Sequence, residues 1–412
     1  MDLRGLLNKT DKHYTPYQFA IFRIIFGLYL IWHFLVLLPD SVELFSSIGI
    51  LGDPKLNFTY PIAPWNILYY FDSPTFVGFF VSGLLILSAM LVLGWQRPAV
   101  ALLLWFGWAC LYNRNNLISN PSIPYIGLLL LLIAIIPKGE PLSFKEKPKD
   151  WDMPLLIPVT AWILMAIGYS YSGIDKLFSP SWQDGSAMTH LLNNPLARDN
   201  FVRDIMLSMP DWSLKLMTWG VVIAEISFLP LCLCRRGRFI AWTVMVFMHI
   251  GIMMVVSFAD LSIGMLMIHL FTFDQRWLGK KKEEVTVLYD GECGLCSRAM
   301  RFIAEEDSMD NFILRSLQKP EGQSLLEKYN LPKEHFDTMV FIKNDKAYIK
   351  SDAAIGIAES LGGIWKLAIL GNYVPRKVRN TYYEWVAKNR LKFFGKGDVC
   401  SIPSKRLRRK LM

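Results

Sequence analysis

Long apolar runs fill the first two thirds of the chain, and no other feature limits its fold as strongly. Eight apolar segments of spanning or near-spanning length lie between residues 16 and 273. They cover residues 16–38, 75–93, 99–112, 122–136, 154–172, 213–234, 239–257 and 261–273. A helix needs about 20 apolar residues to cross a bilayer, so the third, fourth and eighth segments are short. We therefore predict a multi-span α-helical membrane bundle of about eight segments, followed by an α/β domain.

The basic residues between these segments predict an orientation. Cytoplasmic loops of membrane proteins are enriched in Lys and Arg. If the N-terminus is inside, the inner segments hold about three times as many basic residues as the outer loops. This bias predicts a multi-pass cell-membrane protein with both termini and the α/β domain in the cytoplasm. The first apolar run lacks the small-residue cleavage site of a signal peptide, so we expect it to remain as a span.

The formal net charge of +9 is concentrated toward the C-terminus. Between Lys366 and Met412 only two acidic residues, Glu384 and Asp398, accompany many Lys and Arg residues. Aromatic residues alternate with basic ones in residues 375–396, a pattern typical of a helix lying on an anionic membrane surface. A solvated charged face is the alternative. Because this basic tail follows a membrane bundle in the sequence, we expect its partner to be the lipid bilayer and not nucleic acid.

Four ionisable residues lie deep in apolar segments: Arg23, Glu225, His249 and His269. Burial of such groups in a membrane is unfavourable, so each is a functional candidate. The two histidines stand ten residues either side of Ala259, which predicts one common depth, and Glu225 falls near it. This cluster is suited to a metal, a quinone or a proton relay, or to interhelical hydrogen bonds that fix packing. No metal-ligand spacing supports a metal. Arg23 is expected to snorkel to the inner surface.

A polar string follows the fifth segment on the predicted outer side. It reads Tyr171-Ser-Gly-Ile-Asp-Lys-Leu and then Ser181-Trp-Gln-Asp-Gly. The pattern rests on Gly173, Lys176, Leu177, Trp182 and Gly185. It resembles the membrane domain of vitamin K-dependent γ-glutamyl carboxylases and their bacterial relatives, called HTTM, over roughly residues 10–275.

The HTTM resemblance implies a role for Lys176. In the carboxylases the matching lysine is taken as the base that deprotonates a reduced quinone, and desolvation near a membrane would suit a lysine to such work. An interfacial anchor is the alternative role. The carboxylases continue into a large lumenal domain, whereas this chain turns to a thiol domain. Glutamate carboxylation is therefore not expected.

The second informative stretch, VTVLYDGECGLC, runs from Val285 to Cys296. It predicts a strand, a turn and a helix that begins near two cysteines. Cys293 at the helix N-terminus would be the attacking thiol, because the helix dipole there favours a thiolate. Cys296 would resolve the mixed disulfide, and Asp290 either accepts its proton or caps the turn. Half of a zinc site and two incidental thiols are the alternatives, but no second CxxC or HxxxH follows.

The elements after residue 280 alternate between strand and helix patterns. We predict strands at 285–289, 312–317, 339–342 and 347–350, and helices at 295–305, 323–329, 353–361 and 376–390. A β-α-β unit followed by a hairpin and a helix is the thioredoxin order. The predicted domains are therefore a membrane domain over 1–279 and a thioredoxin-like domain with a basic tail over 280–412.

The thiol domain resembles the DCC family, named for an Asp, Cys, Cys signature. The resemblance runs from Val285 to about Pro403. It includes DGECGLC, Ser351-Asp-Ala-Ala, Tyr373-Val-Pro-Arg and the ending from Tyr382 to Gly395. Members are regarded as thiol–disulfide oxidoreductases. Better-understood thioredoxins carry a cis-proline before the third strand, whereas Asp337-Thr-Met stands there in this chain, so peptide binding is not predicted.

Three hypotheses follow. The leading one is a membrane-anchored thiol–disulfide oxidoreductase with a thiol partner, coupled to a quinone or another lipid-soluble molecule in the bundle. The cytosol is reducing, so Cys293 and Cys296 would form a working dithiol. Cys232 and Cys234, at the predicted inner end, are relay candidates or ordinary packed cysteines. The alternatives are a carboxylase/epoxidase-like or other lipid-handling enzyme that uses Lys176, and a non-catalytic redox sensor or scaffold.

Overall fold

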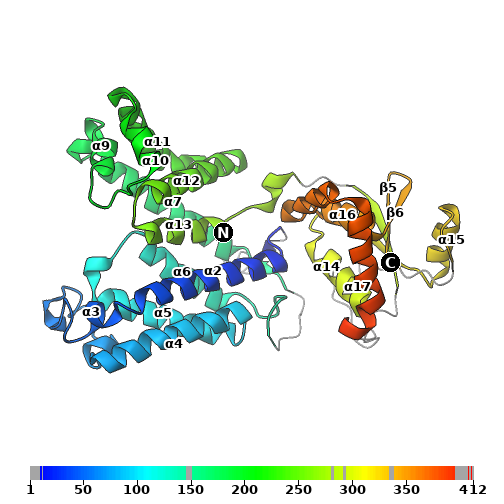
Figure 1. Cartoon of the computed structure of the whole chain (residues 1–412), viewed down its shortest axis with the longest axis horizontal. Coiled ribbons are helices and arrows are strands. Elements are labelled where there is room, and N and C mark those ends of the chain that lie inside the picture. Colours follow the sequence, from blue (N-terminus) through cyan, green and yellow to red (C-terminus); the bar gives the residue numbers. More distant parts are fainter. Residues whose placement is uncertain are drawn as a thin grey trace, which may run out of the picture.

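A helical bundle occupies one end of the computed structural model, and a small α/β domain occupies the other (Figure 1). The structure describes residues 10–11, 13–144, 151–279, 283–290, 294–333 and 338–394, together with Leu407 and Lys410. At residues 259, 294–297 and 390–394 it describes the backbone alone.

Each of the eight apolar segments contains a helix. These helices are α2 (Pro16–Leu37), α4 (Pro74–Leu93), α5 (Arg97–Arg114), α6 (Ser122–Ile135), α7 (Leu156–Lys176), α11 (Asp211–Cys232), α12 (Arg235–Val255) and α13 (Ala259–Phe271). Within the described residues, five of them (α2, α4, α7, α11 and α12) are long and apolar enough to cross a membrane. The chain is thus consistent with a membrane protein, but about eight spans are not confirmed.

Short elements lie between these helices, before the first of them and after the last. They are β1 (Thr10–Asp11), α3 (Ser41–Phe45), η1 (Pro54–Leu56), η2 (Ile67–Tyr69), η3 (Asn116–Ile118), β2 (Met153–Pro154), α8 (Pro180–Gln183), α9 (Ala187–Leu192), α10 (Phe201–Leu207) and η4 (Gln275–Leu278). β1 and β2 pair antiparallel. The two long connections, which hold α3 and α8–α10, lie at the end of the bundle away from the α/β domain (Figure 1).

Local sequence sets several helix boundaries. α2 begins at a proline, and the preceding Thr15 side chain accepts a hydrogen bond from the Gln18 N–H. α4 begins in the same way, with Ser73 as its cap, and ends at Gly94, whose φ of 68° lies in the left-handed region. The bundle core is largely aliphatic and aromatic, with Phe26 fully buried at its centre. Packing of apolar side chains therefore holds the helices side by side.

Arg23 does not snorkel, so that prediction was wrong. The side chain is fully buried inside the bundle. Its guanidinium donates to the carbonyl oxygens of Leu91 and Val92, both at 2.7 Å, and of Leu142 at 2.8 Å. The first two carbonyls belong to the last turn of α4, where the backbone lacks intrahelical partners. These acceptors and the Glu140 carboxylate, 3.7 Å from Arg23 Nε, compensate the charge within the protein, so the side chain need not reach the surface.

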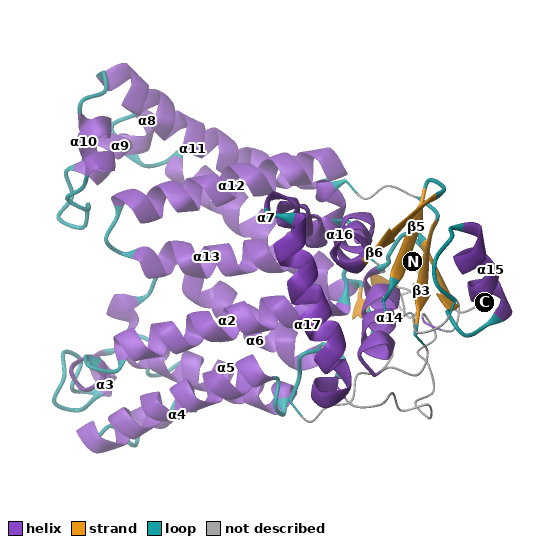
Figure 2. Cartoon of the chain, turned by 45° about the vertical axis from the view of Figure 1, so that its right-hand side comes forward, coloured by secondary structure: helices purple, strands orange, loops and turns teal. Residues whose placement is uncertain are grey.

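The α/β domain follows the predicted element order. Its elements are β3 (Val285–Tyr289), α14 (Gly294–Glu306), β4 (Phe312–Ser316), α15 (Pro320–Lys328), β5 (Val340–Lys343), β6 (Lys346–Ile349), α16 (Lys350–Leu361), η5 (Gly363–Tyr373) and α17 (Arg376–Phe394). The strand order is β4-β3-β5-β6, and only the β3–β4 pair is parallel. One face of this mixed sheet packs on α14 and α16, and the other packs on α15 (Figure 2).

Contacts of Tyr17 and of Lys366 join the α/β domain to the bundle. Tyr17, in the first turn of α2, packs edge-on against Phe302 of α14 and Trp365 of η5, at centroid distances of 4.9 and 6.3 Å. Lys366 Nζ donates to the carbonyl oxygens of Leu278 (2.8 Å) and Gly279 (2.7 Å). The last turns of α14 and the start of η5 therefore rest on the end of the bundle.

Candidate functional site

The CxxC segment stands between β3 and α14. Cys293 lies outside the described residues, and for Cys296 the backbone alone is described. Cys296 is the third residue of α14 and so belongs to the first helical turn. Backbone N–H groups in a first turn have no intrahelical partner and favour an anion. The backbone thus places Cys296 at the helix terminus that the sequence predicts for the dithiol.

Asp290 directly follows β3, at the edge of the sheet where α14 begins. Its carboxylate accepts a hydrogen bond from Gln318 Nε2 at 2.8 Å. Gln318 follows β4 closely, and β3 and β4 are parallel, so their carboxyl ends meet at this edge. The sequence pointed to Asp290 but not to Gln318, because nothing in the local pattern shows that the two strands are neighbours.

Tyr383 of α17 reaches the same edge. Its phenol oxygen accepts hydrogen bonds from the Thr338 hydroxyl at 3.0 Å and from the Met339 N–H at 3.3 Å. β5 runs antiparallel to β3 with Val340 opposite Leu288, so the residues before β5 lie beside the end of β3. Tyr383 was not among the site residues predicted from the sequence. The available signal was its place in the DCC-like ending of the chain.

Polar contacts hold α17 against the β6–α16 junction. Lys350 Nζ pairs with Glu384 at 2.6 Å, and Arg379 pairs with Asp352 at 2.6 Å. The hydrogen bond and charge of Lys350 hold the pKa of Glu384 below its ordinary value. These contacts connect two segments that the DCC resemblance picked out separately, the one after Lys350 and the one after Tyr382. α17 is therefore part of the edge at which α14 begins.

A second candidate site lies inside the bundle, between α7, α11, α12 and α13. It is a cavity of about 640 Å³ with mostly apolar walls. Five methionines contribute to the walls: Met188, Met206, Met217, Met248 and Met265. Lys176, Glu225 and His249 also line the cavity. Three residues that the sequence singled out as candidates thus meet at one space that is large enough for a small ligand.

Lys176 turns into the bundle and forms an ion pair. Its ammonium lies 2.6 Å from Glu225 Oε2 and donates to Ser172 Oγ at 2.7 Å. Its Nζ also lies 5.1 Å from the ring centroid of Trp182. The side chains of Lys176 and Glu225 are 19% and 7% exposed. Such a shielded pair holds both charges at the cavity wall, and losing either partner would leave the other uncompensated.

Two glycines of the HTTM-like pattern have structural roles beside this pair. A Cβ on Gly173 would lie 2.8 Å from the backbone nitrogen of Ile226, so glycine permits the close crossing of α7 and α11. Gly185 has a φ of +82°, which favours glycine, and it stands against Lys215 of α11. The two glycines therefore shape the part of the cavity wall that contains Lys176.

The two predicted histidines lie at one level, as expected, but they share a partner other than Glu225. Tyr169 Oη is 2.8 Å from Nε2 of His249 and 2.8 Å from Nε2 of His269. The phenol can donate to one imidazole and accept from the other, which ties α7, α12 and α13 together. Among the described residues no group of three His, Cys, Asp or Glu side chains is arranged to hold a metal ion. This geometry matches the packing alternative.

A further polar cluster was missed by the sequence analysis. His33 of α2 bonds Asp260 Oδ1 through Nδ1 (2.9 Å) and Tyr112 Oη through Nε2 (2.9 Å). Tyr29 also donates to Asp260 at 3.0 Å. His33 stands within the first apolar segment, so the rule that selected His249 applied to it equally.

The two relay candidates lie at the junction of α11 and α12. Cys232 ends α11, and Cys234 precedes α12. Cys234 Sγ accepts a hydrogen bond from the Gly237 N–H at 3.3 Å, so it caps α12. Both cysteines are free. The structure thus gives Cys234 a structural role at the helix start.

Comparisons with known proteins concern the α/β domain. A family model described as "DCC1-like thiol-disulfide oxidoreductase" matches residues 287–396. YuxK of Bacillus subtilis (strain 168), whose name describes it as uncharacterized, is 42% identical over 126 residues, which are 31% of this chain and 92% of YuxK. A chloroplastic DCC family protein of Arabidopsis thaliana is 32% identical over 117 residues, 28% of this chain and 68% of that protein.

No solved structure matches the chain. The family match stops short of the bundle, so it speaks for the α/β domain alone. Within that domain it covers the last three residues of β3, the CxxC segment, Asp290 and Tyr383. Through this domain the chain belongs to the DCC1-like thiol-disulfide oxidoreductase family.

Proposed function

We propose that this protein is a membrane-anchored thiol–disulfide oxidoreductase whose thioredoxin-like domain carries a Cys293–Cys296 dithiol. One observation carries the proposal: the CxxC segment joins the end of β3 to the start of α14, in a domain of the DCC1-like family. A helix N-terminus at the end of a strand favours a reactive thiolate. The basic residues of the inner loops support a cytoplasmic position for this domain.

The proposed reaction is thiol–disulfide exchange. The Cys293 thiolate attacks one sulfur of a substrate disulfide, and the other sulfur leaves as a thiolate. Cys296 then attacks Cys293, which releases the second substrate thiol and leaves a Cys293–Cys296 disulfide. Asp290 receives the proton of Cys296. Two electrons and two protons pass to the substrate, and a thiol partner returns the enzyme to the dithiol form.

The arrangement of α14 supports a substrate that arrives from the aqueous side. Phe302, near the end of α14, rests on Tyr17 of the bundle. Cys296 stands six residues earlier in the same helix, or about 9 Å along its axis. The C-terminal end of α14 therefore contacts the bundle, whereas its N-terminal end carries the proposed dithiol. We propose that the partner is a soluble thiol or disulfide.

Tyr383 supports a preference for compact substrates. In thioredoxins an extended peptide binds beside the segment that precedes the third strand. Here the Met339 N–H in that segment already donates to the Tyr383 phenol. A peptide would have to displace this contact before pairing with the backbone. We therefore propose that small disulfides, or a partner with a short reactive loop, are better substrates than extended peptides.

Trapping tests the proposed exchange. In the full chain, Cys296→Ser should accumulate a mixed disulfide through Cys293, detectable by mass spectrometry of membranes after acid quenching. Cys293→Ser should accumulate none, and Cys232→Ser combined with Cys296→Ser should leave the trapped species unchanged. If Cys296→Ser captures neither a protein nor a small thiol, the exchange mechanism fails. A Cys293–Cys296 pair whose reduction potential lies near that of the cytosol, but which reduces no disulfide, would favour the sensor or scaffold alternative.

A second candidate function belongs to the bundle cavity. We propose that it binds a lipid-soluble molecule of the quinone class, with Lys176 as the base of an HTTM-like, lipid-handling reaction once its ammonium has passed a proton to Glu225. The supporting observation is the Lys176–Glu225 pair at the wall of a cavity of about 640 Å³. Lys176 ends α7, whose 21 residues extend about 30 Å. Electrons from the dithiol would therefore need a mobile carrier, with the quinone taking two electrons and two protons as the dithiol closes.

A photoreactive quinone analogue tests the cavity. It should label full-length protein in membranes, and excess unlabelled quinone should compete. Gly220→Leu, which adds bulk at the wall without altering charge, should reduce the labelling, and Lys176→Ala should abolish any quinone chemistry. Equal labelling of wild type and Gly220→Leu would exclude this cavity as the site.

A further inference from the structure

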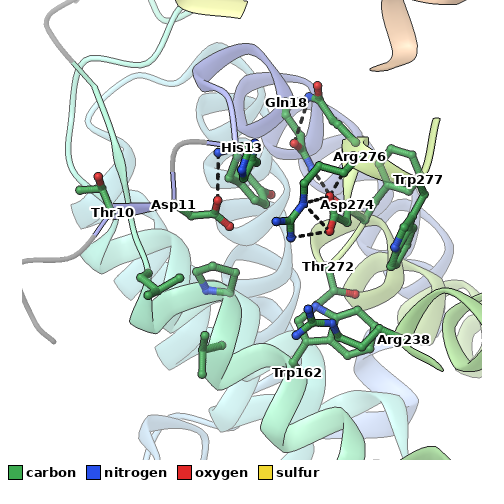
Figure 3. Close-up of a pocket in the computed structure, with 16 residues that line it drawn as sticks. Thr10, Asp11, His13, Gln18, Trp162, Arg238, Thr272, Asp274, Arg276 and Trp277 are labelled. Atoms are coloured by element: carbon green, nitrogen blue, oxygen red, sulfur yellow. Dashed lines mark hydrogen bonds and ion pairs between the residues drawn. The ribbon is translucent and has the colours of Figure 1, made fainter. Parts of the chain in front are cut away.

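A cavity of about 430 Å³ opens at the end of the bundle that meets the α/β domain (Figure 3). Its walls come from the chain segment before α2, the starts of α2, α7 and α12, and the segment from the end of α13 through η4. Neither the dithiol proposal nor the quinone proposal uses it. Tyr17, which holds the α/β domain, is the neighbour of residues that form its wall.

The electrostatics of this cavity favour an anion. Three helices, α2, α7 and α12, start at its walls, and a helix N-terminus carries partial positive charge. Arg276 is engaged, because its guanidinium binds Asp274 at 2.7 to 2.9 Å. Arg238 also lines the cavity, and among the described residues its guanidinium has no partner. Figure 3 shows dashed contacts between Arg276 and Asp274 but none at Arg238.

The start of α12 carries an unusual concentration of positive charge. Arg235, Arg236 and Arg238 all lie in its first turn or directly after it. Basic side chains at a helix N-terminus oppose the helix dipole, so this arrangement is unfavourable in isolation. A bound anion would offset the repulsion. Two acidic groups in the wall would oppose an anion. Asp274 is paired with Arg276, and Asp11 lies on the Arg276 side of the cavity, apart from Arg238 (Figure 3).

Buried polar atoms in the wall lack partners among the described residues. Gln275 is 1% exposed and uses its amide nitrogen to donate to Thr15 and Gln18, while its Oε1 accepts nothing. The Tyr14 hydroxyl, on a side chain that is 5% exposed, and the Trp277 indole N–H are likewise unpaired. Buried groups of this kind are normally satisfied. The set offers two donors and one acceptor to a polar ligand.

We propose that this cavity binds a phosphate ester that also carries a hydroxyl group. Its anionic oxygens would lie against Arg238 and the start of α7, which has no side-chain cap. Its hydroxyl would donate to Gln275 Oε1. Trp162 and Val159 provide apolar wall for the carbon skeleton. The headgroup of an anionic phospholipid such as phosphatidylglycerol and a soluble ester such as glycerol 3-phosphate share this chemistry.

Native mass spectrometry and thermal unfolding of the full chain distinguish the two sources. For the lipid source, protein from nanodiscs that contain phosphatidylglycerol should retain one lipid, and protein from phosphatidylcholine nanodiscs should retain none. For the soluble source, glycerol 3-phosphate should raise the unfolding temperature of detergent-purified protein. Arg238→Gln should weaken either interaction by about tenfold or more, because it removes a charge-assisted hydrogen bond.

Arg236→Gln is the matched control, because it removes the same charge from the same helical turn without altering the cavity wall. It should retain binding within about twofold. Val159→Trp fills the cavity without a change of charge and should also abolish binding. This second variant tests the cavity even if Arg238→Gln fails to fold.

If Arg236→Gln and Arg238→Gln lose binding affinity equally, the ligand is held by a general basic surface and not by this cavity. No binding of either probe to the wild type would overturn the proposal. None of these readouts involves the dithiol, so they stand apart from the proposed oxidoreductase activity.

Discussion

Tyr383 lies on the last described helix, more than 80 residues after Cys296, yet its phenol accepts hydrogen bonds beside the edge of the sheet at which α14 begins. In the proposed oxidoreductase, the contact occupies a backbone N–H that extended substrates would otherwise use. It also fastens α17 to the segment before β5. The same side chain therefore affects both the stability of the edge and access to it.

Replacing this phenol tests both roles. Tyr383→Phe keeps the ring but removes the acceptor, so the free energy of unfolding of the α/β domain should fall by about 1 kcal/mol. The rate with a peptide disulfide should rise relative to the rate with a small disulfide. Tyr382→Phe is the matched control, because that neighbouring side chain is 69% exposed. Equal effects of the two variants on the substrate ratio would contradict a role for Tyr383 at the edge.

Residue identity was predictable where a group was chemically unusual in its surroundings. Glu225, His249 and His269 stood out because charge or polarity is unfavourable within apolar segments, whereas Lys176 was singled out by the HTTM-like pattern. Their partners could not be predicted, because pairing depends on which helices cross and at what height. Glu225 was grouped with the histidines by depth, but it faces Lys176 across the α7–α11 crossing.

At the scale of elements, the crossing of α7 and α11 decides the geometry of the bundle cavity. Gly173 lets the two helices approach until Lys176 and Glu225 meet. A side chain at this position would force the backbones apart. The cavity and its ion pair thus depend on one small residue.

A pair of glycine substitutions tests the crossing. Gly173→Ala should destabilise the protein by about 1–3 kcal/mol, because its Cβ would overlap the α11 backbone. Gly83→Ala, in α4, is the control: a Cβ at this position would have no described neighbour within 4 Å, so the change should be neutral or slightly stabilising. Thermal unfolding in detergent measures both. Equal unfolding temperatures for the two variants would show that the crossing tolerates a side chain.

The η4 segment predicts a dependence of stability on pH. Burial alone would raise the pKa of Asp274, but hydrogen bonds and charge from Arg276 hold it below the ordinary value of 3.8. Because the native pKa is depressed, this carboxylate stabilises the fold above about pH 4 and loses that contribution as the pH falls through the native pKa. Asp274→Asn should lower the unfolding temperature at pH 7 and flatten its decline below about pH 4. If the unfolding temperature of Asp274→Asn declined below about pH 4 as it does in the wild type, this ion pair would be excluded as the cause of the decline.

The positions of the bundle helices were predictable from the apolar runs, whereas the number of helices that cross the membrane was not. A helix lies at every predicted segment, but α6 has only 14 residues and α13 has 13. Helix formation follows from composition and periodicity, while crossing a bilayer depends on length and on neighbours. In the α/β domain the strands appeared in the expected order. η5 was missed, because a 3₁₀ helix lacks the 3.6-residue period by which the α-helices were predicted.

Across the whole molecule, α14 links the proposed dithiol site at its start to the bundle, which it contacts near its end. Tyr17 packs against Phe302, and Phe302 also packs against Trp365 at 4.8 Å. Trp365 Nε1 in turn donates to Glu306 at 2.6 Å. This aromatic group fixes how the α/β domain stands on the bundle, and no local sequence pattern predicts a contact between residues so far apart in the chain.

Removing Tyr17 should loosen this docking. Tyr17→Ala forfeits two edge-on aromatic contacts, each worth about 0.5–1.5 kcal/mol. Amide hydrogen exchange should accelerate in the last turn of α14 and in η5, and stay unchanged in the β5–β6 hairpin. Tyr171→Ala, an exposed tyrosine at the far end of α7, is the control. Unaltered exchange in Tyr17→Ala would show that other contacts hold the domain in place.

The central claim is that the dithiol, and not the bundle lysine, performs the redox chemistry. The most direct test is the rate at which purified full-length protein reduces a small disulfide with a thiol donor present. We predict that Cys293→Ser abolishes this rate and that Lys176→Ala leaves it within about twofold of wild type. Turnover that survives in Cys293→Ser, or that is lost in correctly folded Lys176→Ala, would contradict the assignment.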